Sequence, residues 1–327
     1  MRFSTAGVRL HAEGDPFRLN ASVPVAATPR PDARMPIRSI VVATDLSSHE
    51  HIAVHRAAQL AAAHGATLRV VYLPARRDVR PLSEAGLAAA ASQMQTALAL
   101  ALEVAPMRAA SVDELGVLAK AADLLVVPHR RERSTAAFFR GQPVVRLLRA
   151  CRCPVLVVRA LRSRRYARVL VAVDLSPASH ALVKVAAHLE PQAELEIFNA
   201  LDTLNEARLR SAEATEAAVR AYRQRCLEEA RDRMVAFTDS FDARRNRFLT
   251  TIGRGDPGSQ AVVQQERSGA DLVVVGKRTA TAWEDFLCGS VAHRVLSWGS
   301  SDVLVVPQAH VEATAPIAMR RMRGAHA

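Results

Sequence analysis

The stretch IRSIVVATDLS at residues 37–47 decides the fold, because it returns as YARVLVAVDLS at residues 166–176. Two later stretches repeat in the same order: ADLLVVPHRR at 122–131 as ADLVVVGKRT at 270–279, and CPVLVVR at 153–159 as DVLVVPQ at 302–308. A repeat of this length is a duplicated domain and not one turn of a solenoid. We therefore divide the chain into copy 1, residues 37–160, and copy 2, residues 166–307.

The strands of both copies are continuous apolar runs, such as VVAT at 41–44, VLVAV at 169–173 and LVVV at 272–275. Runs without polar alternation indicate strands covered on both faces, which is typical of parallel sheets flanked by helices. The fold class that we predict is α/β, with two doubly wound five-stranded parallel sheets in strand order 3-2-1-4-5. In such a sheet a ligand binds where the carboxyl ends of strands 1 and 4 part.

The same order of elements is expected in each copy. For copy 1 we predict strands at 40–44, 67–73, 107–110, 123–127 and 155–158, and helices at 48–63, 83–104, 111–121 and 144–150. For copy 2 we predict strands at 169–173, 194–199, 247–252, 272–275 and 303–306, and helices at 178–189, within 205–241, at 258–267 and at 290–298. The offset between the copies grows from 129 to 148 residues, so copy 2 carries the longer middle section.

The chain has 327 residues, half of them hydrophobic, which suffices for two packed cores. Residues 1–36 and 308–327 lack periodicity, and we expect a disordered N-terminal tail and a basic C-terminal tail. No apolar run approaches the ~18 residues of a membrane span, and the opening residues do not form a secretory signal. With only four cysteines, the sequence indicates a cytoplasmic protein in a reducing compartment that does not bind membranes.

The formal charge of +12 favours anionic partners, but we favour a generally basic proteome as its explanation. Aromatic residues make up 4% of the chain, so the stacking surfaces of single-strand binders are missing. The sequence therefore disfavours a nucleic-acid partner, for which the charge is the sole argument.

A glycine-containing motif follows the fourth strand of copy 2. It reads Gly276-Lys277-Arg278-Thr279, then nine residues, then Gly289-Ser290 at the start of a helix. A glycine lets the backbone approach a phosphate, and the amides at a helix start supply donors and a positive end. The Ser290 hydroxyl adds a further hydrogen bond, while Lys277 and Arg278 add charge-assisted ones. Asp174, at the end of the first strand, points into the same crevice and accepts from an amino group or a hydroxyl.

This motif resembles that of the universal stress protein family, whose nucleotide-binding members carry Gly-x-x-Gly, nine residues, and Gly-Ser or Gly-Thr at this place. The resemblance extends over residues 37–307 and implies an adenine nucleotide alpha hydrolase-like fold. It also implies that copy 2 binds ATP or a related adenine nucleotide, with or without Mg²⁺. The contacts that it implies are Val173, Asp174, Gly276, Lys277, Arg278, Gly289, Ser290 and Val291.

Two departures from the family pattern lie in this loop. Thr279 replaces the second glycine, which costs on the order of 1 to 2 kcal/mol if the position needs a left-handed backbone. Glu284 and Asp285 bring negative charge near the expected phosphates. Copy 1 departs further, with Pro128 and Arg131 in place of the glycines and Gln142-Pro143 after Gly141. We interpret copy 1 as degenerate for nucleotide, although its loop arginines leave another anion open.

Three other patterns are interpreted as structural. Gly253-Arg254-Gly255-Asp256-Pro257-Gly258 matches the dinucleotide pattern, but it follows the third strand of its copy and lacks the later acidic residue. His51 and His55 have a metal-ligand spacing, and Cys151 and Cys153 lack a second pair, so we expect no metal site. Cys288 before a helix start is a minor candidate for a reactive thiol.

The sequence carries no paired nucleophile and base, so we expect no enzyme, or at most slow ATP hydrolysis. The function that we infer is a regulatory stress-response protein that binds ATP or another adenine nucleotide through copy 2 and acts on an unknown protein partner. The alternative is a nucleotide-free scaffold or adaptor. The resemblance further implies that the closing strands at 155–158 and 303–306 pair within the chain, and it leaves a homodimer open.

Overall fold

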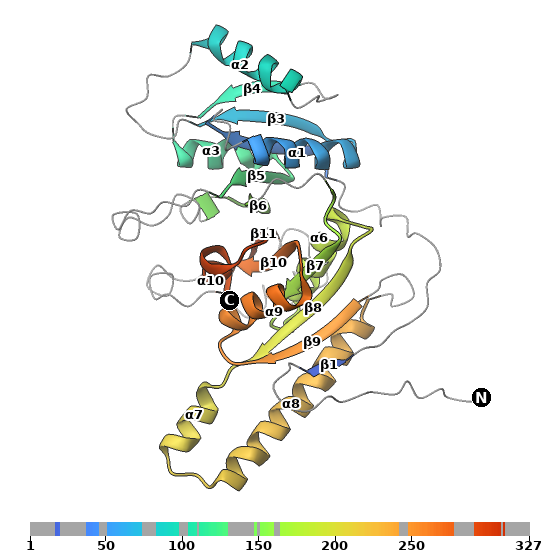
Figure 1. Ribbon diagram of the computed structural model, residues 1–327, viewed down its shortest axis with the longest axis vertical. Coiled ribbons are helices and arrows are strands. Elements are labelled where there is room, and N and C mark those ends of the chain that lie inside the picture. The colour runs from blue at the N-terminus through green and yellow to red at the C-terminus, as the bar shows by residue number, and fades with distance from the viewer. Residues whose placement is uncertain are drawn as a thin grey trace, which may run out of the picture. The chain divides into compact units, whose positions relative to one another are not determined.

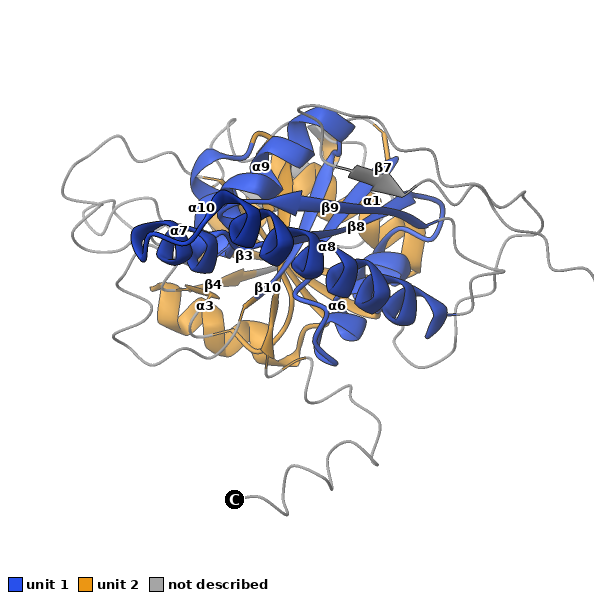
Figure 2. Cartoon of the chain, turned by 90° about the horizontal axis from the view of Figure 1, so that it is seen from below, with its two compact units in different colours: residues 1–31, 166–276, 280–299 blue, residues 32–165, 277–279, 300–327 orange. Residues whose placement is uncertain are grey.

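The computed structural model describes two compact units and most of their strands and helices. The described residues are 17–19, 37–45, 51–73, 83–97, 104–109, 111–129, 147–148, 151–159, 164–241, 248–277, 291–308 and 310. Unit 1 comprises residues 1–31, 166–276 and 280–299, and unit 2 comprises residues 32–165, 277–279 and 300–327 (Figure 2). The units do not coincide with the two copies, because the last strand of copy 2 belongs to unit 2.

Unit 2 is built around six strands in the order β11-β6-β5-β2-β3-β4. Five come from copy 1 and have the predicted order 3-2-1-4-5, all in parallel pairs. Their bounds, with the copy 2 strand last, are β2 Ser39–Thr44, β3 Thr67–Tyr72, β4 Val104–Arg108, β5 Leu124–Pro128, β6 Val155–Val158 and β11 Asp302–Pro307. Both β5 and β6 are buried along their whole length, as their apolar runs predicted.

The prediction of two separate five-stranded sheets is wrong. Strand β11 belongs to copy 2 by sequence but pairs antiparallel with β6 of copy 1, with Leu304 opposite Leu156. The expected pairing of the two closing strands within the chain is thereby confirmed. The physical reason is that β6 would otherwise present an apolar, unpaired edge.

The helices of unit 2 follow the prediction with one change. They are α1 His51–His64, α2 Glu84–Ala97, α3 Val112–Leu118 and the short 3-10 helix η2 Ala119–Ala121. Ser111 caps α3 as predicted, because its hydroxyl accepts a hydrogen bond from the Glu114 amide at 3.2 Å. The helix expected up to residue 104 ends earlier, since Val104–Arg108 forms β4. Pro106 is tolerated within β4 because this strand is the last in the order of the unit. The helix expected at 144–150 lies largely outside the described residues.

Unit 1 contains the strand order β1-β9-β8-β7-β10, so the copy 2 strands also follow the predicted 3-2-1-4 sequence. The bounds are β1 Phe17–Leu19, β7 Arg168–Ala172, β8 Glu194–Leu201, β9 Phe248–Arg254 and β10 Leu272–Lys277. Within the segment 1–36, Phe17–Leu19 pairs antiparallel with the edge of β9. The unpaired backbone groups of an edge strand explain this addition.

Helices cover both faces of the unit 1 strands, as a doubly wound sheet requires. They are α6 Ser179–Leu189, α7 Leu204–Ser211, α8 Glu216–Asp239, α9 Pro257–Ser268 and α10 Val291–Trp298. In Figure 2, α9 and α10 lie on one side of these strands and α6 lies on the other. Among the described residues, no helix combines the length and the apolar character that crossing a membrane requires.

The long polar helix expected within 205–241 is two helices. The chain turns between α7 and α8, where Glu213 adopts a left-handed backbone with φ of 56° and Thr215 caps α8 by accepting from the Ala218 amide. The two helices form a hairpin that projects beyond β8 and β9 (Figure 1). This hairpin accounts for the extra length of copy 2.

Candidate functional site

Strand β7 is the point in unit 1 where the direction of winding reverses. Its Ala172 is paired with Val275 of β10 on one side and with Phe198 of β8 on the other. The next residues along these parallel strands are Val173, Gly276 and Asn199, which therefore share the carboxyl edge of the sheet. Ligands of doubly wound sheets bind at this switch point.

Asp174 is held in one orientation at this edge. Its Oδ1 accepts hydrogen bonds from the Ser179 hydroxyl at 2.7 Å and from the Ser176 amide at 3.0 Å. The Asp174 amide in turn donates to the Ser179 hydroxyl at 3.3 Å. Arg233 of α8 donates to the Asp174 carbonyl at 3.4 Å. The side chain is exposed, and a carboxylate has about four acceptor positions, so it can accept several hydrogen bonds at once. The sequence did not identify Ser179, although it lies one helical turn beyond Asp174.

The residue after Asp174 has an unusual backbone. Leu175 has φ of 57°, one of two non-glycine residues with positive φ in the described part of the chain. A leucine in this region costs on the order of 1 to 2 kcal/mol, because its Cβ crowds the backbone. Strain of this kind concentrates where a side chain must be aimed for function.

Val173 is engaged within the sheet by both of its backbone polar groups. Its amide donates to the Phe198 carbonyl at 2.8 Å, and its carbonyl accepts from the buried Asn199 side-chain amide at 2.8 Å. A carbonyl has two lone pairs, so one acceptor position remains for a ligand. A hydrogen bond from the nucleotide to the Val173 backbone is therefore expected at this second lone pair of the carbonyl oxygen.

Gly276 is exposed at the end of β10 and does not have the left-handed backbone that would by itself require glycine. A Cβ added there would lie 3.2 Å from Cδ1 of Leu182, so the absent side chain lets Leu182 of α6 pack closely against the strand end. Lys277 is the last residue of β10 and is half-buried, and Val291 is the first residue of α10. The other predicted contacts, Arg278, Gly289 and Ser290, lie outside the described residues, as do Thr279, Glu284 and Asp285.

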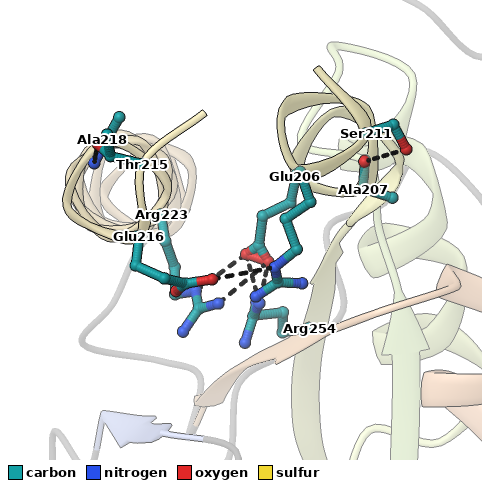
Figure 3. Close-up of polar contacts among 9 residues, drawn as sticks. Glu206, Ala207, Ser211, Thr215, Glu216, Ala218, Arg223 and Arg254 are labelled. Carbon is teal, nitrogen blue, oxygen red and sulfur yellow. Dashed lines mark hydrogen bonds and ion pairs between the residues drawn. The ribbon is translucent and has the colours of Figure 1, made fainter. Parts of the chain in front are cut away.

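A second polar cluster near the end of β9 was missed by the sequence analysis. Glu206 of α7 is almost fully buried and accepts from Arg223 of α8, with Nε to Oε1 at 2.9 Å, and from Nη2 of Arg254 at the end of β9 (Figure 3). Burial alone would raise the pKa of Glu206, but the hydrogen bonds from Arg254 and Arg223 outweigh it and lower the pKa below its ordinary value. The cluster fastens the helical hairpin to the sheet.

The glycines of the dinucleotide-like pattern have structural roles in this fold. A Cβ at Gly253 would lie 2.7 Å from Cζ of Phe198, and one at Gly258 would lie 2.7 Å from Cδ of Arg294. Gly255 has φ of 129°, and Asp256 caps α9 by accepting from the Ser259 amide at 2.8 Å. Packing and capping thus account for the pattern without a dinucleotide.

No group of three histidine, cysteine or acidic side chains comes together within the described ranges. A Mg²⁺ that accompanied a nucleotide needs no such group, because it would be held by the phosphates with one or two carboxylates. Cys151 and Cys153 are buried free thiols; their mutual hydrogen bond lowers the pKa of Cys151 and raises that of Cys153. Cys288 lies outside the described residues.

Comparison with known proteins agrees with this architecture. A protein of unknown function from Pseudomonas aeruginosa PAO1 is similar at 20% identity with a TM-score of 0.58, covering 88% of this chain and 99% of that one. A universal stress protein from Archaeoglobus fulgidus DSM 4304 is similar at 14% identity and a TM-score of 0.57, covering 84% and 97%. A universal stress protein in complex with cAMP is 32% identical over 38% of this chain and 98% of its own, with a TM-score of 0.32.

No curated protein matches the chain. The sequence model of the universal stress protein family, in contrast, matches residues 36–159 and again residues 165–307. These two matches cover most of the chain, and their order is that of the two repeats. The chain therefore belongs to the universal stress protein family, with two domains of that family in tandem.

Proposed function

We propose that the chain is a regulatory stress-response protein that binds ATP or a related adenine nucleotide at the carboxyl ends of β7 and β10. The observation that carries this proposal is that Asp174 and Gly276 lie at the carboxyl ends of two neighbouring parallel strands, β7 and β10, at the switch point of unit 1. A fixed carboxylate on one strand lies next to a strand end without a side chain on the neighbouring strand. The left-handed backbone at Leu175 adds support, because it holds the Asp174 loop in a strained form.

Each group has a distinct part in this proposal. The Asp174 carboxylate accepts from a ribose hydroxyl or the adenine amino group, and its hydrogen bonds to Ser176 and Ser179 fix it before the ligand arrives. Gly276 allows close approach of the ligand to the backbone. The helix that begins at Val291 directs its positive end toward a phosphate.

The bound nucleotide acts by shifting a conformational equilibrium. Whichever state of the protein binds nucleotide better becomes more populated, and contact with a protein partner changes accordingly. We propose no rapid chemistry, since the sequence carries none of the motifs that pair an activated nucleophile with a base. Any hydrolysis of ATP is then slow compared with its binding.

Isothermal titration calorimetry with ATP, with cAMP as a second adenine ligand, tests the proposal. Wild-type protein should bind ATP saturably, and Asp174→Asn should bind at least about tenfold more weakly, because a charge-assisted hydrogen bond is worth ~1.5–3 kcal/mol. Asp45→Asn is the matched control, since Asp45 holds the same place in copy 1 and should leave affinity unchanged. Equal losses in both variants, or no binding by wild-type protein, would contradict the proposal.

A nucleotide-free adaptor is the second candidate. The observation that favours it is the engagement of Val173, whose amide and carbonyl are both already bonded within the sheet. On this account the Asp174 loop is a structural remnant, as we infer for copy 1. Absence of saturable binding by wild-type protein for both ATP and cAMP would favour the adaptor.

A further inference from the structure

The pairing of β6 with β11 buries a charged residue between two strands of nearly identical apolar sequence. Asp302, the first residue of β11, is fully buried. The apolar residues that follow are Val-Leu-Val-Val in both strands, and Leu304 pairs with Leu156 at the centre. These apolar residues cannot distinguish one closing strand from the other, because either strand would pack equally well against a second copy of itself.

Two partners of Asp302 come from copy 1. Its Oδ1 accepts from the Arg159 amide at 2.8 Å, directly after β6. Its Oδ2 lies 3.9 Å from Nε of Arg56 on α1, whose side chain is only 2% exposed. Arg56 also donates to the Gln59 side chain and to the Arg164 carbonyl, each at 2.9 Å, which holds the guanidinium in place.

The corresponding residues of copy 2 cannot provide these contacts. Helix α1 aligns with α6 through shared buried positions, with Val54 matching Val183 and Leu60 matching Leu189, so Val185 corresponds to Arg56. The closing strands align so that Pro307 corresponds to Arg159 and Pro154 corresponds to Asp302. A valine offers no charge, and a proline offers no amide hydrogen.

We propose that Asp302 makes the pairing of the closing strands selective, so that β11 accepts β6 and rejects the β11 of a second copy of this chain. In a pairing of two β11 strands, each Asp302 would be buried next to Pro307 in place of Arg159, without the amide or the guanidinium that it contacts in this structure. Burying a carboxylate without its partners is costly, whereas an apolar strand pays no such penalty. Specificity of this kind arises because the pairing of two β11 strands is unfavourable, and not because β11 binds β6 more strongly than an apolar strand would.

The test is made in the full chain and replaces the copy 1 partners of Asp302 by the residues at the corresponding positions of copy 2. Arg56→Val and Arg159→Pro replace the two copy 1 partners by their copy 2 counterparts, singly and together. Hydrogen exchange of the amides of residues 303–306 reports whether β11 stays paired. We expect the double variant to exchange at least about thirtyfold faster than wild-type protein, because a buried charge loses its partners.

Asp302→Val is the decisive second change. Added to the double variant, it should restore protection to within about threefold of the Asp302→Val single variant, because the buried charge is gone. If the double variant does not fold, recovery of folding on adding Asp302→Val gives the same result. Arg168→Val removes an exposed ion pair with Glu194, at 3.6 Å, and serves as the control that should leave exchange unchanged. Unchanged protection in the double variant, or no recovery with Asp302→Val, would overturn the proposal.

Discussion

Strands β5 and β10 hold the same place in the two copies, but they end in different chemistry. β5 ends at Pro128, which has no amide hydrogen, whereas Gly276 at the same place in β10 keeps its amide and carries no side chain, so that Leu182 packs closely against it. The neighbouring first strands also differ: the Thr44 carbonyl is bonded by the Leu73 amide, and the Val173 carbonyl by the Asn199 side chain. A duplicated fold therefore conserves its strands and diverges at their carboxyl ends.

The largest expected effect comes from replacing Gly276 of copy 2 by proline, the residue at the corresponding position of copy 1. Gly276→Pro removes the amide and adds a ring near Leu182, and we expect ATP affinity to fall about 100-fold in calorimetric titration. Pro128→Gly should leave the affinity unchanged, because copy 1 lacks the other elements of the motif. Comparable affinity of Gly276→Pro and wild-type protein, with the fold intact by circular dichroism, would remove the proposed site.

The helical hairpin of copy 2 stands where copy 1 has α2, between the second and third strands, and its attachment gives the next effect. Glu206→Gln should lower the free energy of unfolding by roughly 1–2 kcal/mol at pH 7 in urea denaturation, since a buried carboxylate loses charge-assisted hydrogen bonds. Water around the half-exposed Arg223 and Arg254 limits the loss. Glu216→Gln, which removes an exposed pair with Arg210, should change stability by less than ~0.5 kcal/mol.

The same variant has a pH dependence of known sign. The pKa of Glu206 is lower in the folded state than its ordinary value of 4.5, so its stabilising contribution is complete above that pH. The contribution is lost as the pH falls through the lower folded pKa. The difference in stability between wild-type protein and Glu206→Gln should therefore shrink on acidification below about pH 4.5, and a constant difference would contradict this account.

A smaller effect is expected from the residue that orients Asp174. Ser179→Ala removes the 2.7 Å hydrogen bond, and we expect ATP to bind about threefold to tenfold more weakly, as one neutral donor to a carboxylate predicts. Ser176→Ala is the matched control, because Ser176 contacts Asp174 through its backbone amide. Equal affinities of the two variants would show that Asp174 does not depend on Ser179.

The smallest effect concerns His180 on α6, which packs against Phe237 and Phe241 and bonds the Ser240 hydroxyl at 2.8 Å. Burial lowers its pKa below 6.5 despite a hydrogen bond to the Pro177 carbonyl. Protonation therefore favours the unfolded state, and stability falls as the pH drops below 6.5. His180→Gln should make the stability curve between pH 7.5 and 5 less steep in chemical denaturation.

Part of that slope should persist, because burial also lowers the pKa of His55 and His310. As the matched comparison, the stability of His51→Gln, at the corresponding position of copy 1, is measured over the same pH range. A slope for His180→Gln equal to that of wild-type protein would contradict the assignment.

Apolar runs made the strands predictable, because a fully buried strand needs an unbroken series of branched side chains. The run at Val155–Val158 was predicted to the residue. The triplet Ala-Asp-Leu opens the repeated stretch before the fourth strand of each copy, at 122–124 and 270–272. The reason for its aspartate appears only in the structure. Asp123 accepts from the Arg38 amide at 2.8 Å, and Asp271 accepts from the Ala167 amide at 2.9 Å, so each aspartate fastens the start of strand 1.

Local breaks and distant partners were not predictable in the same way. The turn between α7 and α8 contains neither glycine nor proline and depends on Glu213 in a left-handed conformation. The ion pair between Arg56 and Asp302 joins residues from different copies, and no spacing rule connects them. Periodicity predicts which side chains are buried, but which polar groups meet follows from how the elements pack.

The placement of β11 in unit 2 has a consequence for protein synthesis. Strand β6 ends at Val158, and β11 begins at Asp302. At ~5–20 residues per second, the roughly 150 intervening residues leave the edge of β6 open for on the order of 10 s on the ribosome. An open apolar edge is prone to aggregation during this interval. The half of the molecule that is translated first is therefore the half that is completed last.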